Sequence, residues 1–461
     1  MSAATADVPT PGAEPGLKKV IGRKLLIFFI IGDVLGAGIY ALVGSVAAET
    51  GGAIWLAFLA SLALALITAF AYAELVTKYP KAAGAALYVN KAFRVPFVSF
   101  MVAFTVMCSG VTSAATLSTA FGGDYLSAFV DVDGTLVGVL FILVVAAINL
   151  RGISESVKLN AVLTTIEVGG LILVSIIAIA AITSGAEGTD PGRAFDIKAD
   201  TSVLAAMVGG AGLAFYALIG FEDSVNVAEE AKDPRRDYPW ALFGGLIAAG
   251  IIYLIVTILA SMTVPTGDLT ESSGALQLVA SEGPLGVSDK VFSAIALFAL
   301  ANGALINMIM ASRLLYGMSN EGVLPAVLGK VSPRTRTPWV AIGFTTALAA
   351  VLIIVGNLDD LASMTVFLLL GVFTVVNVCV LVLRRETVDH HHFTAPTIIP
   401  VIGAAVCLAF MIFNTDGDIA LKALYLLAVG AILFVVTWFA GGRREMDTSV
   451  MEAIQNPGDR R

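Results

Sequence analysis

The stretch Ile30-Ile31-Gly32-Asp33-Val34-Leu35-Gly36-Ala37-Gly38-Ile39-Tyr40 interrupts a long apolar segment with three glycines and one aspartate. A second apolar segment is interrupted in the same way by Phe215-Tyr216-Ala217-Leu218-Ile219-Gly220-Phe221-Glu222. Glycine costs roughly 1 kcal/mol in a helix interior relative to alanine, so each segment is predicted to contain a weakened helix. Within a bilayer, a broken helix persists only where its freed backbone groups line a cavity or are buried in protein. The pair therefore predicts a polar site near the middle of a membrane.

The composition is that of an integral membrane protein. Of the 461 residues, 58% are hydrophobic and 13% are charged, whereas soluble domains average roughly 45–50% and about 25%. Apolar stretches of about 20 residues, the length that crosses the hydrocarbon core, recur along nearly the whole chain. We predict an all-α integral membrane fold with twelve transmembrane segments, at approximately 25–48, 53–76, 97–120, 135–150, 157–183, 202–228, 240–264, 289–317, 338–356, 361–383, 396–414 and 417–440.

The two interruptions fall in the first and the sixth predicted segments, which suggests a repeated architecture. Two five-segment repeats would be followed by two extra helices, and the sixth segment would run opposite to the first, as in inverted-repeat transporters. The expected parts are a disordered N-terminal tail (1–19), a transmembrane domain (20–442, with repeats of about 20–183 and 200–384 and extra helices of about 396–440) and a C-terminal tail (443–461).

The basic residues predict the orientation of the chain. With both termini in the cytoplasm, only Arg193, Lys198, Lys290 and Lys422 of the 27 lysines and arginines fall outside. Such a bias follows the positive-inside rule and agrees with an even number of crossings. We therefore expect a multi-pass protein of a cell membrane, either a plasma membrane or a bacterial inner membrane. The mixed-charge residues 229–237 are interpreted as a solvated cytoplasmic loop, with a salt-bridge gate to the N-terminal basic residues as the alternative.

Each predicted break offers backbone groups to a ligand. An unwound step at Gly36 to Gly38 would expose N–H groups at the start of the following half-helix, an end suited to a carboxylate. A break at Ala217 to Gly220 would free carbonyls for an ammonium group, and Phe215, Tyr216 and Phe221 could close over it. The alternatives are a contact of small residues between helices and ordinary aromatic packing.

Several further segments, read together with the two breaks, carry a family resemblance. They are Tyr72-Ala73-Glu74-Leu75 with Tyr79-Pro80 and Ala83-Gly84, Ala228-Glu229-Glu230 with Asp233-Pro234-Arg235-Arg236-Asp237 and Pro239, and Ser312-Arg313-Leu314-Leu315-Tyr316 with Gly322, Leu324-Pro325, Val331-Ser332-Pro333 and Thr337-Pro338. In this order they resemble permeases of the amino acid–polyamine–organocation superfamily, which have the LeuT-type fold.

The resemblance implies roles at the matching positions. A substrate carboxylate would bind the N–H groups around Ala37 and Gly38, and an ammonium group would bind carbonyls of Val34, Tyr216 and Ile219, with Tyr216 as an aromatic gate. The expected substrate-binding residues are Val34, Gly36, Ala37, Gly38, Tyr216, Ala217 and Ile219, and the candidates for side-chain selectivity are Cys108, Ser109, Asn302, Asn307 and Ser363.

Three acids are candidates for coupling or gating. Glu167 lies about ten residues into the fifth segment, roughly 15 Å deep, where an ionisable side chain costs about 3 kcal/mol and is functional by default. Several proton-coupled or sodium-independent members of the resembled superfamily carry a lysine at the similar position, so a coupling mechanism based on that lysine does not carry over to this chain. Because of its depth, Glu167 is the hypothetical proton acceptor here, or else a structural hydrogen-bonding group. Asp33 could favour a cationic ligand, hold a proton or cap the unwound step. Glu222 is expected to form a gating or structural hydrogen bond rather than to contact the substrate.

The expected function is secondary active transport of amino acids by alternating access, with proton-coupled uptake. An amino acid exchanger and an amine or polyamine transporter remain alternatives. An enzyme is not expected, because the chain has no HExxH or GxSxG motif and no intramembrane histidine. The expected partners are an amino acid, a proton and the lipid bilayer, without nucleic acid, cofactor or metal; the adjacent His390, His391 and His392 lack metal-ligand spacing. The residues do not indicate an oligomeric state.

Overall fold

The computed structural model describes residues 21–35, 37–80, 84–151, 156–320, 324–333, 335 and 337–440. Within these ranges the chain is helical and has no β-strand, only two isolated bridges, Ile21 to Ala231 and Gly51 to Ile197. The α-helices are α1 (Arg23–Val34), α2 (Gly38–Thr50), α3 (Ile54–Lys78), α4 (Gly84–Phe93), α5 (Pro96–Phe121), α6 (Asp124–Ser127), α7 (Gly134–Arg151), α8 (Ser156–Ser184), α9 (Val203–Tyr216), α10 (Pro234–Thr263), α11 (Thr266–Glu271), α12 (Ala275–Ser281), α13 (Asp289–Asn320), α14 (Trp339–Val355), α15 (Leu358–Leu383), α16 (Ile398–Phe413) and α17 (Gly417–Ala440). Three 3₁₀ helices are η1 (Arg193–Phe195), η2 (Asp223–Glu230) and η3 (Ala326–Gly329).

The longer of these helices are apolar enough to cross a membrane. In the described part of the chain eight helices meet that condition, and α1 with α2 forms a ninth candidate that is bent by 42° at its break. Three further helices, α9, α14 and α16, are apolar but shorter. Every one of the twelve predicted segments overlaps one of these helices or broken pairs. The chain is therefore a helical membrane protein whose apolar segments lie where hydropathy predicts them.

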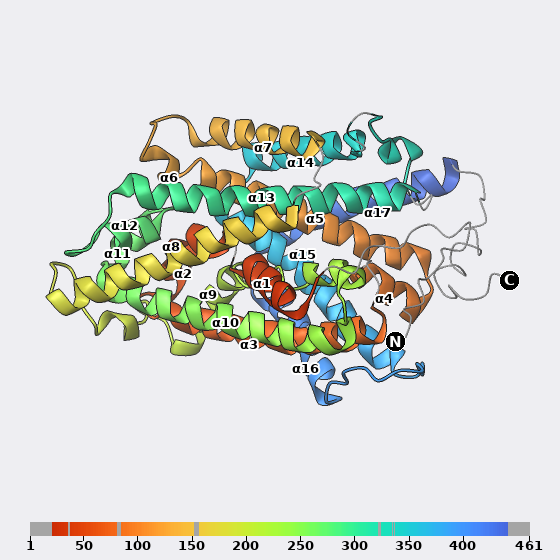
Figure 1. The fold of residues 1–461 in the computed structure, drawn as a ribbon, viewed down its shortest axis with the longest axis horizontal. Helices are drawn as coiled ribbons and strands as arrows, with labels where there is room; N and C mark the ends of the chain where they lie inside the picture. Colours follow the sequence, from red (N-terminus) through yellow and green to blue (C-terminus); the bar gives the residue numbers. More distant parts are fainter. Residues whose placement is uncertain are drawn as a thin grey trace, which may run out of the picture.

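The long helices run side by side along the long axis of the molecule (Figure 1). The pair α7 and α14 lies along one edge and the pair α3 and α10 along the opposite edge, with α1 and α15 between them in this view. Helices α5 and α13 pack against each other, and α5 also packs against α15. This arrangement brings the two interrupted helices, α1–α2 and α9, into the interior of the bundle.

Several short helices connect the long ones and were not predicted. Helix α4 packs against α5 and α15, and α11 and α12 pack against α2. They are too short to cross a bilayer, since about 20 residues are needed, so a search for long apolar runs does not find them.

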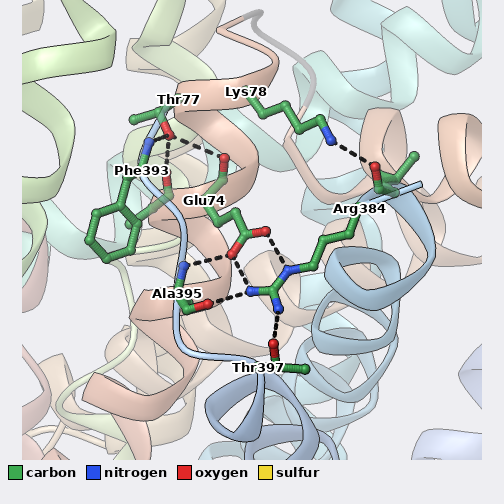
Figure 2. Close-up of polar contacts among 9 residues, drawn as sticks. Glu74, Thr77, Lys78, Arg384, Phe393, Ala395 and Thr397 are labelled. Carbon is green, nitrogen blue, oxygen red and sulfur yellow. Dashed lines mark hydrogen bonds and ion pairs between the residues drawn. The ribbon is translucent and has the colours of Figure 1, made fainter. Parts of the chain in front are cut away.

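An ion pair fastens one end of α3 to the segment between α15 and α16 (Figure 2). Glu74 accepts hydrogen bonds from Arg384 Nε and Nη2 at 2.8 and 2.7 Å and from the Ala395 N–H at 2.8 Å. Next to this pair, Lys78 donates to the carbonyls of Leu383 and Glu386 at 2.7 and 2.6 Å. The hydrogen bonds that Arg384 donates to Glu74 raise the pKa of Arg384 above its ordinary value, so its guanidinium stays charged.

The interpretation of residues 229–237 as a solvated loop is wrong for Asp237. This residue lies in the first turn of α10, and its Oδ1 is 2.6 Å from Arg23 Nε on α1. Only 13% of the Asp237 side chain is exposed. The pairing fits the alternative, a salt bridge to the N-terminal basic residues. The side chains of Glu229 and Glu230 lie outside the described part of the structure.

Candidate functional site

The first break separates α1 from α2. Helix α1 ends at Val34, and α2 begins at Gly38 with Ala37 as its N-cap. The first N–H groups of an α-helix have no acceptor within the helix and carry the positive end of its dipole. Gly36, predicted to bind substrate, lies outside the described residues. The break therefore presents a helix N-terminus at Ala37 and Gly38, as the glycine pattern predicts.

The second break follows α9. The helix ends at Tyr216, a turn covers residues 217–222, and the 3₁₀ helix η2 follows. Gly220 has φ of +118°, a conformation that favours glycine. Its N–H, which would bond to the Tyr216 carbonyl in a continuing helix, donates to Glu222 Oε2 at 2.8 Å instead. Glu222 thus caps the break, and this agrees with its expected structural hydrogen bond.

The two breaks touch each other. A Cβ atom added to Gly38 would lie 2.6 Å from Ala217 Cα, so only glycine allows this approach. Both breaks also share one donor on α10: the Tyr253 hydroxyl donates to the Val34 carbonyl at 2.6 Å and lies 3.1 Å from the Ala217 carbonyl. The role of Tyr253 cannot be recognised from the sequence, because nothing local to α10 relates this residue to partners 219 and 36 positions away.

A cavity of about 60 Å³ lies between the breaks and the helices α5, α13 and α15. One water needs at least about 10–15 Å³ by this measure, so the cavity is large enough for several waters or a small polar solute. Of the substrate-binding residues predicted from the sequence, six line it: Val34, Ala37, Gly38, Tyr216, Ala217 and Ile219. The cavity thus gathers residues that are about 180 positions apart in the chain.

Some of the candidates for side-chain selectivity line the cavity and others do not. Ser109, Asn302 and Asn307 line the cavity. Cys108 is fully buried and does not line it, and Ser363 lines a separate small pocket beside Gly212 and Asn414. Cys108 and Ser363 therefore do not contact this cavity.

Three carboxylates line the cavity, and a fourth lies behind its wall. Asp33, Glu222 and Asp223 are lining residues. Glu167, on α8, is fully buried and does not line the cavity, but its Oε1 accepts a hydrogen bond from Asn302 Nδ2 at 3.1 Å. In the described part of the structure, Glu167 Oε2 and Asp33 Oδ2 have no hydrogen-bond partner. No lysine, arginine or histidine is among the described lining residues.

The aromatic candidate Tyr216 is held to the opposite wall. Its hydroxyl lies 3.0 Å from Ser113 Oγ and 3.2 Å from the Ser113 carbonyl on α5. The ring therefore spans the cavity from α9 to α5. Ser113 was not predicted, since this contact joins residues 103 positions apart.

No group of three or more potential metal ligands is found among the described residues. His390 and His392 lie with their rings 6.3 Å apart in the segment after α15, far along the chain from the breaks. The three cysteines are buried and unpaired.

Comparison with known proteins identifies the family. A family model described as "Amino acid permease" matches residues 21–440. A methylthioribose transporter of Bacillus subtilis is 27% identical over 446 residues, covering 90% of this chain and 93% of the relative. A branched-chain amino acid permease of the same bacterium is 24% identical over 450 residues, 93% of this chain and 94% of the relative.

A plant relative is similar over a smaller part of its own length. A vacuolar cationic amino acid transporter of Arabidopsis thaliana is 29% identical over 397 residues, 81% of this chain and 64% of the relative. Because the family model covers most of the 461 residues, this multi-pass membrane protein belongs to the amino acid permease family, within the amino acid–polyamine–organocation superfamily.

Proposed function

We propose that this chain is a secondary active transporter that carries amino acids across a membrane by alternating access, with uptake coupled to protons. The observation that carries the proposal is the meeting of two helix breaks at one cavity inside the bundle. Discontinuous helices at a central site are typical of secondary transporters, in which half-helix ends bind the charged groups of the substrate.

The two sides of the cavity suit the two ends of a zwitterion. The N-terminus of α2 at Ala37 and Gly38 favours a carboxylate, and Gly36 is proposed to belong to the same turn. The carbonyls of Val34, Tyr216 and Ile219 are the proposed acceptors for the ammonium group, with Ala217 leaving space beside them. Two of the three relatives are amino acid transporters by name, which supports this substrate class.

The architecture we propose is the LeuT-type fold with twelve crossings. Repeats of about 20–183 and 200–384 would be related by inverted topology, and the helices of about 396–440 would be added to them. Both termini would lie in the cytoplasm, in accordance with the positive-inside rule. The proposed location is a cell membrane.

Glu167 is the proposed proton site. It contacts Asn302, and Asn302 lines the cavity, so a change in the charge of Glu167 would act on the substrate through one hydrogen bond. Its free oxygen, Oε2, can take a proton without breaking a hydrogen bond in the described structure. Asp33, which lines the cavity directly, is the second candidate.

Tyr216 is the proposed gate. Its bond to Ser113 closes the space between α9 and α5, and breaking it would open the cavity on that side. Glu222 is proposed to hold the turn at residues 217–222, which follows Tyr216, by accepting a hydrogen bond from the Gly220 N–H.

The acidic lining favours a second candidate, a cationic substrate such as an amine or polyamine. Asp33, Glu222 and Asp223 face the cavity, and the described lining contains no basic side chain to balance them. An unpaired charge buried in a protein is costly, so a ligand with two positive groups would be stabilised here. Uptake measurements distinguish the two candidates.

The deciding experiment is uptake into proteoliposomes of labelled L-leucine, L-arginine, putrescine and methylthioribose, with and without an inward proton gradient. Accumulation of an amino acid that follows the gradient and vanishes with an uncoupler is the expected result. Uptake only into vesicles preloaded with amino acid would make the protein an exchanger. Uptake of putrescine or methylthioribose alone would remove the zwitterion from the proposal.

Glu167→Gln tests the proton site. The amide keeps the size and a hydrogen-bonding oxygen but cannot take up the proton, so we expect uptake that no longer exceeds equilibrium when a gradient is imposed. Counterflow needs only binding and reorientation, so its rate is expected to stay within about threefold of the wild-type rate. A change of that size corresponds to less than the roughly 1.4 kcal/mol of a tenfold change.

Glu271→Gln is the matched control, since Glu271 is an exposed acid at the end of α11. It is expected to accumulate substrate like the wild type at every pH. If Glu167→Gln also responds to the gradient like the wild type from pH 5 to 8, Glu167 is a structural hydrogen-bonding group and not a proton site.

A further inference from the structure

Tyr253 links the two breaks through a single hydroxyl group. Its oxygen is 2.6 Å from the Val34 carbonyl, at the end of α1, and 3.1 Å from the Ala217 carbonyl, just after α9. The side chain is fully buried in α10, with the ring of Phe58 edge-on against it at 5.6 Å. A phenol has one proton, so the shorter bond to Val34 takes most of it and the Ala217 contact shares it.

We propose that Tyr253 is the positioning residue of the transport site: it holds the carbonyls of the two breaks in a fixed register, so that they act together on the substrate. The inference rests on the proposed function, because the carbonyl of Val34 is one of the proposed acceptors for the substrate's ammonium group. Tyr253 itself does not line the cavity, so it acts through Val34 and Ala217 and not by touching the substrate.

The geometry explains why one residue can have this effect. Val34 and Ala217 both line the cavity, and Gly38 approaches Ala217 so closely that no side chain fits between them. A carbonyl oxygen has two acceptor lone pairs, so the bond from Tyr253 leaves Val34 able to accept one more hydrogen bond. When supporting groups hold a site within about 0.5 Å of its binding geometry, the site is already ordered before the ligand arrives. Binding then does not cost the free energy of ordering the site.

The test compares Tyr253→Phe with Tyr125→Phe. Tyr125 is also fully buried, and its hydroxyl donates at 2.8 Å to the Tyr40 carbonyl in the first turn of α2, so it does not join the first break to residues 215–222. The two variants therefore remove the same group from the same kind of bond and differ only in whether that bond holds the breaks. Both are measured in two ways: hydrogen exchange of the backbone amides of residues 30–40 and 215–222, and KM and maximal rate for labelled L-leucine and L-arginine.

Tyr253→Phe is expected to exchange its amides in residues 215–222 about tenfold faster than the wild type, because the turn loses its tie to α1 and α10. KM is expected to rise about tenfold with the maximal rate within about twofold, since the loss falls on binding. Tyr125→Phe is expected to keep both values near the wild type while losing a similar amount of thermal stability.

Three results would overturn the proposal. Unchanged exchange at residues 215–222 in Tyr253→Phe means that the hydroxyl does not hold the break, whatever the transport data are. Faster exchange with an unchanged KM means that the register is irrelevant to binding. A lower KM means that Tyr253 competes with the substrate for Val34.

Two further provisions keep the test decisive. If the wild type takes up no amino acid, the proposed function has failed, and the exchange comparison still decides whether Tyr253 holds the breaks. If Tyr253→Phe does not fold, Phe58→Leu takes its place: this change removes the ring that supports Tyr253 and leaves its hydroxyl, and it is expected to alter exchange and KM in the same direction by about threefold.

Discussion

Among the residues of the two breaks, Gly38 has little freedom to change. A Cβ atom there would meet Ala217 Cα at 2.6 Å and Ala217 N at 3.3 Å, and backbone atoms cannot rotate out of the way. Gly38→Ala is therefore expected to force the two breaks apart, lowering stability by about 1–3 kcal/mol, as overpacking does. Uptake is expected to fall at least tenfold, because the same shift widens the site. Thermal unfolding in detergent and initial uptake rates measure the two effects.

Gly244→Ala is the control for this change. Gly244 lies in α10, and an added Cβ would meet nothing within 4 Å. Alanine is the better helix former by up to about 1 kcal/mol, so this variant is expected to unfold at the same or a higher temperature with normal uptake. Normal uptake by Gly38→Ala would show that the breaks can separate without loss, and would contradict the close-approach argument.

Residues whose role follows from the neighbouring sequence could be predicted, whereas residues whose role depends on tertiary contacts could not. Gly38 and Gly220 weaken a helix wherever they stand in it, so the breaks follow from the sequence around them. Tyr253 and Ser113 are ordinary members of apolar helices until folding brings them to Val34 and Tyr216. Glu167 was predicted at the site, but the structure interposes Asn302 between it and the cavity.

At the scale of elements, the Glu74–Arg384 ion pair joins the end of α3 to the end of α15 (Figure 2). Only 2% of the Glu74 side chain is exposed, and 22% of that of Arg384. Arg384→Met would leave a buried carboxylate whose remaining hydrogen-bond donor, in the described part of the structure, is the Ala395 N–H. Removing one partner of a buried pair costs roughly 3–5 kcal/mol, and the partial exposure of Arg384 puts our expectation at the lower end. Thermal unfolding of the purified variant measures this loss.

Lys422→Met is the matched control, because Lys422 also pairs with a carboxylate at 2.7 Å but has 49% of its side chain exposed. Its loss is expected to cost at most about 1 kcal/mol. Equal losses for the two variants would mean that burial adds nothing to the Glu74–Arg384 pair.

The pH dependence of this pair follows from Arg384. The pKa of Arg384 is raised by Glu74, so the stability that its charge provides is present below its ordinary, strongly basic pKa and is lost only as the pH rises above that pKa. The difference between wild type and Arg384→Met is therefore expected to stay constant between about pH 6 and 9.

Hydropathy predicts the long helices but not the ion pairs that hold them together. The apolar runs of α3, α10 and α15 exceed the length of a crossing, so their positions follow from composition. The ion pair at Glu74 joins residues 310 positions apart, and the sequence indicated only that Glu74 stands at a helix end. From the sequence, a salt bridge between residues 229–237 and the N-terminal basic residues is only the alternative, since charges in a cytoplasmic loop are usually solvated, and the structure identifies the pair as Arg23 and Asp237.

For the whole molecule, the proposed inverted topology depends on whether the sixth predicted segment crosses the membrane. Helix α9 has 14 residues, about 21 Å at 1.5 Å per residue, which is shorter than the roughly 30 Å of a hydrocarbon core. A full crossing needs the turn at residues 217–222 and η2 to continue in the same direction. A re-entrant segment, which enters and leaves on one side, would instead place both of its flanks in the same compartment.

Labelling of single cysteines separates these two topologies. Glu187 and Arg235 are exposed and flank the sixth segment, and no other predicted crossing lies between them. In a chain whose Cys108, Cys379 and Cys407 are replaced by alanine, we expect Glu187→Cys to react with a membrane-impermeant maleimide in intact cells. Arg235→Cys is expected to react only after the cells are opened, because a crossing puts it in the cytoplasm. If both cysteines are labelled in intact cells, the sixth segment is re-entrant. The later segments would then cross in the opposite direction, which rules out the inverted repeat.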